Sequence, residues 1–185
     1  MTVTEAEIIE GCKAGKRELQ KALYTRFSGK MFAVCLRYSK NREEAEDLLQ
    51  DGFIKVFHSI EKFMGSGSFE GWIRRIMVNT ALELIRKKKL DFSSFDIEHV
   101  ESYSDHITDM TTTIAENELL AMIQELPAGY KTIFNLYAIE GYQHNEIAEM
   151  LGISEGTSKS QLARARHILQ EKLKRIEINY RPQVK

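Results

Sequence analysis

The first half of the chain carries the hydrophobic spacing of amphipathic helices. Between residues 45 and 60, apolar or small residues recur in steps of three and one, which a period of 3.6 residues explains. They are Ala45, Leu48, Leu49, Gly52, Phe53, Val56, Phe57 and Ile60. Asn41 precedes Glu44 by three residues, the spacing of a capping pair that starts a helix. Thr4 and Glu7 repeat this spacing, so the pattern predicts helices after Thr4 and after Asn41.

The stretch from residue 68 to residue 89 predicts a helix with two different faces. At about 100° per residue, one stripe is suited to a core and consists of Ile73, Met77, Thr80 and Leu84. A separate stripe consists of Trp72, Arg75, Asn79 and Arg86, and three lysines follow it. An aromatic ring, guanidinium groups and an amide together suit stacking on a base while phosphates are held. Packing of Trp72 in the core is the alternative, and Leu82 on the same stripe favours it.

Beyond Pro127 the chain predicts three helices with the arrangement of a helix-turn-helix. Gly141 and Gly152 stand at the chain reversals, where positive φ is needed, and Ser154 is placed to cap the third helix. The inward stripe of that helix is Ser158, Leu162, Ala165, Leu169 and Leu173. Its other side carries Lys159, Ser160, Ala163, Arg164 and His167. Basic and small polar residues in this position indicate a helix that enters the major groove of DNA, and a plain helical hairpin is the alternative.

The charge pattern separates these two helical segments. The net charge is only -1, but residues 1–90 carry 17 Lys and Arg against 12 Asp and Glu, and residues 91–118 carry 8 acids and no Lys or Arg. Residues 119–185 carry 9 Lys and Arg against 7 acids. The acidic stretch is also rich in Ser and Thr and has no sustained periodicity, so it predicts a linker. A solvated surface loop inside one domain is the alternative.

Composition narrows the class of protein. No apolar run approaches the ~18 residues of a membrane span, and the N-terminus lacks a basic stretch followed by an apolar one. Cys12 and Cys35 have no metal-binding or redox spacing, which favours a cytoplasmic protein. The five histidines are scattered and the GSGS segment is too short to cradle phosphates. We therefore expect no enzyme activity and no metal or other cofactor.

Several blocks of the sequence resemble the bacterial sigma-70 family, in its small extracytoplasmic-function (ECF) group. The blocks are NREEAEDLLQDGFIKVF, FMGSGSFEGWIRRIMVNTALELIRKKK, the dipeptide LP and EIAEMLGISEGTSKSQLARAR. Their order and separation match over about residues 10 to 175. The resemblance implies an all-α protein of two small helical domains, a region 2 bundle at 1–90 and a region 4 helix-turn-helix at 116–185. An acidic flexible linker at 91–115 would join them.

The resemblance also implies a function, in which core RNA polymerase is the main partner. The chain is expected to direct promoter recognition, DNA melting and transcription initiation. Its acidic-faced helix would dock on the clamp helices of the largest polymerase subunit through Glu44, Asp47, Leu48, Gln50, Asp51 and Phe53. Glu43 and Glu46 extend this acidic strip, which solubility alone would also explain. An anti-sigma factor is a further partner that the family implies.

Promoter DNA, both duplex and single-stranded, is the other implied partner. The minus-10 element would be opened and read by Phe63, Ser66, Trp72, Arg75, Asn79 and Arg86. A base of the non-template strand would flip into a pocket near Phe63 and Asn79. The minus-35 element would be read by Lys159, Ser160, Ala163, Arg164 and His167.

Three residues depart from the family pattern. Ser158 occupies a usually apolar position and is expected to weaken packing of the recognition helix. Gln161 occupies a position that is often basic and should remove a phosphate contact, and Glu83 falls near a usual Asp. A stand-alone helix-turn-helix regulator that binds duplex DNA without polymerase is the alternative function. It leaves the stripe of Trp72 and Asn79 and the acidic helix without a role.

Overall fold

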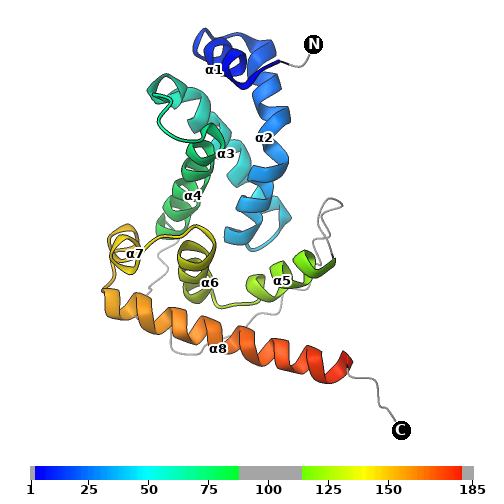
Figure 1. Ribbon diagram of the computed structural model, residues 1–185. Coiled ribbons are helices and arrows are strands. Elements are labelled where there is room, and N and C mark those ends of the chain that lie inside the picture. Colours follow the sequence, from blue (N-terminus) through cyan, green and yellow to red (C-terminus); the bar gives the residue numbers. More distant parts are fainter. Residues whose placement is uncertain (1–2, 88–113, 181–185) are drawn as a thin grey trace. The chain divides into compact units, whose positions relative to one another are not determined.

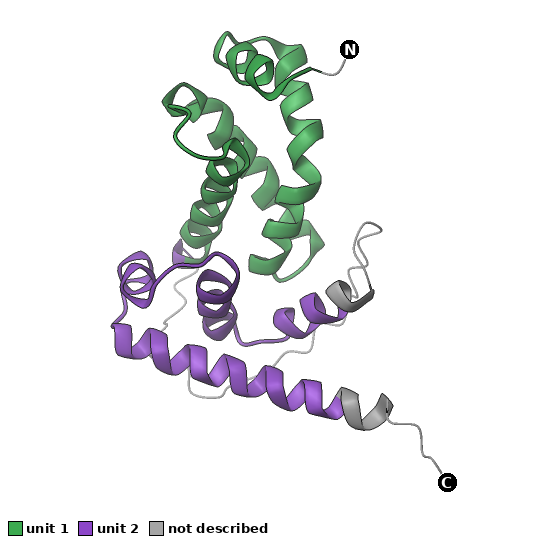
Figure 2. Ribbon diagram, in the orientation of Figure 1, with its two compact units in different colours: residues 1–85 green, residues 86–185 purple. Residues whose placement is uncertain are grey.

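The computed structural model describes residues 3–87 and 114–180, and every regular element in those two ranges is helical. The all-α prediction is therefore confirmed for this part of the chain. The chain divides into two compact units, unit 1 at Met1–Ile85 and unit 2 at Arg86–Lys185 (Figure 2). The predicted linker lies outside the described residues up to residue 113, and its last two residues already belong to a helix. The domain boundaries at residues 90 and 115 stay predictions.

Unit 1 is a bundle built around one long helix. Its elements are α1 (Glu5–Lys13), α2 (Arg17–Tyr38), α3 (Arg42–Ser59), the 3₁₀ turn η1 (Ile60–Lys62) and α4 (Phe69–Lys87) (Figure 1). The last two residues of α4 fall in unit 2 by the division given above. Helix α2 packs against both α1 and α3, and α1 also contacts η1.

Both predicted helix starts are present in unit 1. The Thr4 hydroxyl accepts from the Glu7 backbone N–H at 3.3 Å, and the Glu7 carboxylate accepts from the Thr4 N–H at 2.8 Å, which completes a capping box. Asn41 Oδ1 accepts from the Glu44 N–H at 2.9 Å. The Glu44 carboxylate binds the backbone N–H of Lys40 instead of Asn41, so this pair caps α3 without the reciprocal bond.

The predicted apolar faces of α3 and α4 form part of the core of unit 1. In α3 the stripe from Ala45 to Val56 is buried, whereas Phe57 is half-buried. In α4 the core stripe is buried from Ile73 to Thr80, and Leu84 at its end is half-buried. The two helices approach closely at one point. A methyl group added to Gly52 would lie 2.1 Å from the sulfur of Met77, so only glycine fits there.

Unit 2 contains the predicted helix-turn-helix and two helices before it. Its elements are α5 (Ile114–Gln124), α6 (Ala128–Phe134), the π-helical segment η2 (Asn135–Ile139), α7 (His144–Leu151) and α8 (Glu155–Tyr180). The core cluster consists of Ile123, Leu126, Tyr130, Ala165 and Leu169. Gly141 and Gly152 adopt positive φ, 81° and 68°, at the two reversals, as predicted.

The prediction of an inward stripe on α8 is wrong for one of its residues. Leu173 is 45% exposed, whereas the four earlier members of the stripe are buried. The buried cluster ends one turn before it, at Leu169, and α8 continues beyond that cluster. The apolar spacing along this long helix therefore continues beyond the last residue that packs in the core.

Two mid-helix glycines give a direct test of the contact between α3 and α4. Alanine has the same intrinsic preference over glycine in both helices, about 1 kcal/mol. At Gly29 an added Cβ meets nothing within 4 Å, whereas at Gly52 it meets the fully buried Met77. We expect Gly52→Ala to be less stable than Gly29→Ala by about 1–3 kcal/mol because of overpacking. Urea unfolding measures the difference, and equal free energies of unfolding would contradict the close approach.

The two cysteines are predicted to be unreactive in the folded chain. Both thiols are buried, and burial raises the pKa of Cys35 to about 12 and also raises the pKa of Cys12. Only the thiolate is a nucleophile, so iodoacetamide at about pH 8 should leave native Cys35 unmodified. Both cysteines should be alkylated in urea, as mass spectrometry would show. Rapid alkylation of Cys35 in the native chain would contradict its burial.

Candidate nucleic-acid interface

Trp72 is held at the start of α4 by a cluster of aromatic rings. Its ring centroid lies 5.4 Å from that of Phe63 and 5.8 Å from that of Phe69. The angle between the ring planes of Trp72 and Phe69 is only 12°. Phe27 of α2 contacts Phe69 edge-on at 5.7 Å. Trp72 is half-buried, so the interpretation as a core residue and the interpretation as an exposed ring each hold in part. The indole packs on the core and still has accessible surface.

Phe63 lies beneath Trp72 rather than at the surface. Its ring is 8% exposed and contacts both Phe69 and Trp72. Little of Phe63 is accessible here, and its assignment to the minus-10 site stays a prediction. The neighbouring Met64 is 89% exposed instead, at the start of a loop in which Gly65 and Gly67 have positive φ. Ser66 is exposed in the same loop.

The outward face of α4 carries a row of polar side chains. Arg75, Asn79 and Arg86 are all exposed, as predicted, and Leu82 is buried. The row also includes the exposed Glu83, which we did not assign to it. The Glu83 carboxylate pairs with Lys55 of α3 at 2.6 Å. Near the other end of α4, Glu70 pairs with Lys30 of α2 at 2.6 Å.

The acidic face of α3 is mostly available to a partner. Asp47, Gln50 and Asp51 are exposed, and Glu44 is half-buried beside the helix start that it stabilises. Glu43 and Glu46 are also exposed, and Glu46 pairs with Arg42 at 2.8 Å. Leu48 and Phe53 are only 2% exposed, and their assignment as docking contacts stays a prediction. Their side chains anchor α3 in the core.

Two exposed apolar residues near this face were missed by sequence reasoning. Ile54 is 53% exposed on α3, and Tyr24 is 41% exposed on α2 with its ring 4.7 Å from that of Phe53. Ile54 is an apolar residue outside the apolar stripe of α3. This position was the signal in the sequence that could have predicted its exposure. An apolar group beside carboxylates is common in protein-binding surfaces.

The recognition helix α8 presents the predicted residues outward. Lys159, Ser160, Ala163, Arg164 and His167 are all exposed. Ser154 caps the helix by accepting from the Thr157 N–H at 3.0 Å. Arg164 donates to the Tyr130 hydroxyl at 3.3 Å, and Lys159 pairs with Glu155 at 3.1 Å.

The two departures in α8 are buried. Ser158 is fully buried, and its hydroxyl is 2.8 Å from Nδ1 of His144. A bonded hydroxyl thus occupies this position, and the expectation that Ser158 weakens packing stays a prediction. Gln161 is 5% exposed, so its side chain faces inward and its predicted effect on a phosphate contact does not follow.

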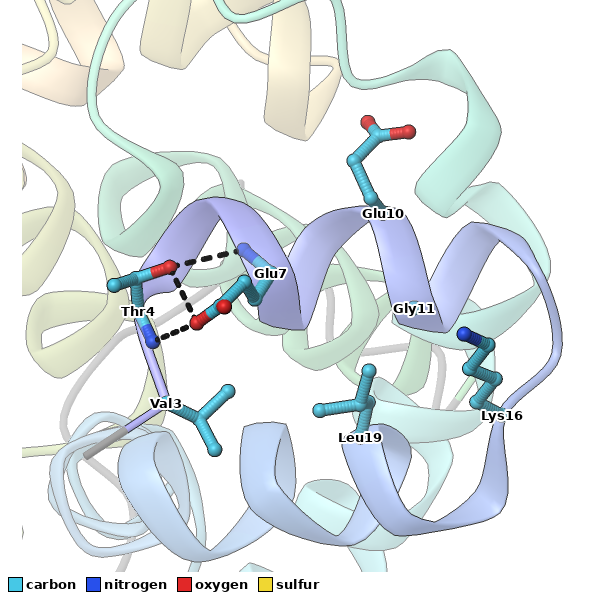
Figure 3. Close-up of a pocket in the computed structure, with 7 residues that line it drawn as sticks. All are labelled: Val3, Thr4, Glu7, Glu10, Gly11, Lys16 and Leu19. Carbon is cyan, nitrogen blue, oxygen red and sulfur yellow. Dashed lines mark hydrogen bonds between the residues drawn. The ribbon is translucent and has the colours of Figure 1, made fainter. Parts of the chain in front are cut away.

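A groove of about 790 Å³ lies between α1 and the start of α2 in unit 1, and none of the predicted site residues lines it (Figure 3). It is lined by Val3, Thr4, Glu7, Glu10, Gly11, Lys16 and Leu19. Hydrogen bonds to Thr4 lower the pKa of the Glu7 carboxyl, which is the helix-capping group described above. Glu10 pairs with Lys13 at 3.0 Å. Thr4, Glu7 and Glu10 of this groove thus make contacts within α1 and its cap.

Neither metal ligands nor a membrane span is found in the part of the chain that the structure describes. Within residues 3–87 and 114–180, no three His, Cys, Asp or Glu side chains are grouped to hold a metal ion. None of the helices in the same ranges is long and apolar enough to cross a bilayer.

Comparisons with known proteins match both units. Sigma-70 region 2 matches residues 23–90, and sigma-70 region 4 matches residues 116–169. An ECF RNA polymerase sigma-E factor of Haemophilus influenzae is 31% identical over 184 residues, covering 92% of this chain and 96% of that protein. The ECF sigma factor SigW of Bacillus subtilis is 29% identical over 177 residues, covering 90% of this chain and 95% of SigW.

A solved structure supports the fold. The chain is similar to the sigma factor RpoE of Bartonella quintana, solved in complex with the anti-sigma factor NepR, with a TM-score of 0.52. The two share 24% identity, and the match covers 83% of this chain and 96% of RpoE. Since both sigma regions and relatives over nearly the full length agree, the chain belongs to the sigma-70 family, in its group of ECF RNA polymerase sigma factors.

Proposed function

We propose that this ECF sigma factor docks on core RNA polymerase through α3, reads and opens the minus-10 element with α4, and reads the minus-35 element with α8. The observation that carries the proposal is the outward row of α4, which joins a braced indole to Arg75, Asn79 and Arg86. This surface suits an unpaired strand, because the ring stacks on a base while the guanidinium groups hold phosphates.

The docking surface on α3 consists of Asp47, Gln50 and Asp51, with Glu44 at its edge. The clamp helices of the largest polymerase subunit are the proposed partner. Exposed carboxylates steer association with a basic surface, and the neighbouring Ile54 adds apolar area. A stand-alone DNA-binding regulator would need none of these groups.

The free-energy cost of opening duplex DNA explains why the polymerase is required. Opening duplex DNA costs about 1.4 kcal/mol per base-pair step, so a bubble of about ten pairs costs on the order of 14 kcal/mol. Each base stacked on an aromatic side chain returns only about 1–3 kcal/mol. The net charge of -1 also gives the free chain little attraction for DNA. This sigma factor therefore selects and starts the opening, and polymerase contacts supply the rest.

We further propose that the chain works in the cytoplasm, without a cofactor and without catalysing a reaction itself. RNA synthesis belongs to the core polymerase, and the sigma factor contributes recognition. Control by an anti-sigma factor stays a prediction of the family resemblance.

Replacing Asn79 tests the minus-10 surface. Asn79 is exposed, so Asn79→Ala should leave the fold intact and remove one polar contact to the strand. We expect open complexes to fall by about five- to tenfold, with polymerase binding unchanged. Permanganate reactivity of unpaired thymines measures the opening. Thr25→Ala, at an exposed position of α2, is the control and should open promoters normally. Undiminished melting by Asn79→Ala would remove this residue from the site.

Removing two charges tests the docking face. Asp47→Asn with Asp51→Asn keeps the shape of α3 but removes two exposed carboxylates. We expect affinity for core polymerase to fall by about tenfold at low salt, and the difference from wild type to shrink at high salt. The matched control is Glu18→Gln with Glu61→Gln, which removes two exposed acids elsewhere in unit 1. If both double variants bind polymerase equally, the docking face lies elsewhere.

A further inference from the structure

The helix-turn-helix of this chain contains an unusual polar contact between its two helices. Ser158 of α8 is fully buried, and its hydroxyl is 2.8 Å from Nδ1 of His144, the first residue of α7. A buried hydroxyl without a partner is costly, so this bond is important to the geometry of the interface. When the ring proton is on Nε2, the hydroxyl donates to Nδ1.

A third element joins the contact through Tyr137 of η2. The rings of His144 and Tyr137 are stacked, with centroids 4.5 Å apart and planes 24° apart. The guanidinium carbon of Arg166 lies 5.5 Å from the centroid of the Tyr137 ring, so α8 reaches this ring as well. His144 therefore links η2, α7 and α8 through one side chain.

This link lies directly under the residues proposed to read DNA. Ser158 immediately precedes Lys159 and Ser160, which are exposed on the first turns of α8. Because a helix is a stiff rod, fixing the roll of α8 at Ser158 fixes where these neighbouring side chains point. Base contacts in the major groove depend on such placement.

We propose that neutral His144 is a positioning residue for upstream-element recognition, which sets the roll of α8 through Ser158 and Tyr137 and releases it on protonation. The inference rests on the proposed role of α8 in reading the minus-35 element. It assigns no DNA contact to His144 itself.

The surroundings of His144 favour the neutral ring. Burial lowers its pKa below the ordinary value, and the nearby cations Lys159 and Arg166 lower it too, whereas Glu155 opposes them. From η2 the facing group is Tyr137, and on α7 the Glu146 carboxylate is bonded to the Gln143 backbone N–H. Protonation reverses the direction of this bond, because Nδ1–H then donates to the Ser158 hydroxyl, and it adds a second cation beside Arg166 at the Tyr137 ring and near Lys159. The repulsion among these cations loosens the contact.

The sign of the pH effect follows from the lowered pKa. The neutral form is favoured by the fold, so its contribution is complete above the ordinary histidine pKa and is lost as the pH falls through the lowered value. Duplex binding at the upstream element should weaken over the same range. His167 is a second histidine, exposed on α8, so the wild-type profile must be compared with a variant that lacks only His144.

The test uses the full chain assembled with core polymerase. The probe is a fluorescent duplex selected from a random-sequence library by the wild-type holoenzyme, and its binding is followed by anisotropy from about pH 7.5 to about pH 5.5. His144→Phe keeps a ring beside Tyr137 but removes the partner of Ser158. We expect it to bind about tenfold more weakly at pH 7.5, which is about 1.4 kcal/mol, and to lose the acid-dependent weakening that is attributable to His144. Adding Ser158→Ala to His144→Phe should restore part of the affinity, because the buried hydroxyl is then gone.

The controls separate positioning from stability. His58→Gln changes an exposed histidine of α3 and should retain the wild-type pH profile. Wild-type affinity and pH profile in His144→Phe would overturn the proposal. Weaker binding with an unchanged pH profile would also overturn it, since His144 would then only stabilise the fold. If the wild-type holoenzyme selects no duplex at all, the proposed function fails first, so the two failures are distinguishable.

Discussion

The roll of α4 about its own axis is the constraint on which the proposed minus-10 surface depends. Ile73 and Met77 are completely buried, and burying each such side chain contributes about 1.5–3 kcal/mol. The exposed ion pairs Lys30–Glu70 and Lys55–Glu83 brace the same helix, but pairs of this kind contribute about 0–1 kcal/mol. Burial therefore decides which face points outward, and Gly52 leaves room for Met77. Arg75 and Asn79 are exposed as a consequence.

The same division between buried support and exposed contact recurs at the other surfaces. Phe63 and Phe69 brace Trp72, Leu48 is buried beneath the acidic face of α3, and the buried Ser158 is bonded to His144 near the start of α8. At each of these surfaces, the exposed residues proposed to contact a partner are therefore held in position by a buried side chain. This arrangement suits a recognition factor, whose groups act by placement and leave the chemistry to a partner enzyme.

Much of the architecture could be predicted because helical periodicity reports burial directly. Helix caps and tight turns could also be predicted, because they depend on local sequence rather than on tertiary contacts. Examples are the capping residues Thr4 and Ser154 and the glycines at positive φ, Gly141 and Gly152. Periodicity failed where a helix outlasts its core, as at Leu173, since it does not report the length of the neighbouring elements. The family resemblance supplied the candidate sites but could not distinguish a buried Phe53 from an exposed Asp51. The bond between His144 and Ser158 joins residues 14 positions apart in sequence, which no local pattern reports.

The most direct test of the account is run-off transcription by purified core RNA polymerase on a genomic library, with and without this chain. The account predicts transcripts that appear only when the chain is present and whose start sites share two separated upstream motifs. The absence of chain-dependent transcripts, from a preparation in which the chain and core polymerase form a stable complex, would contradict it.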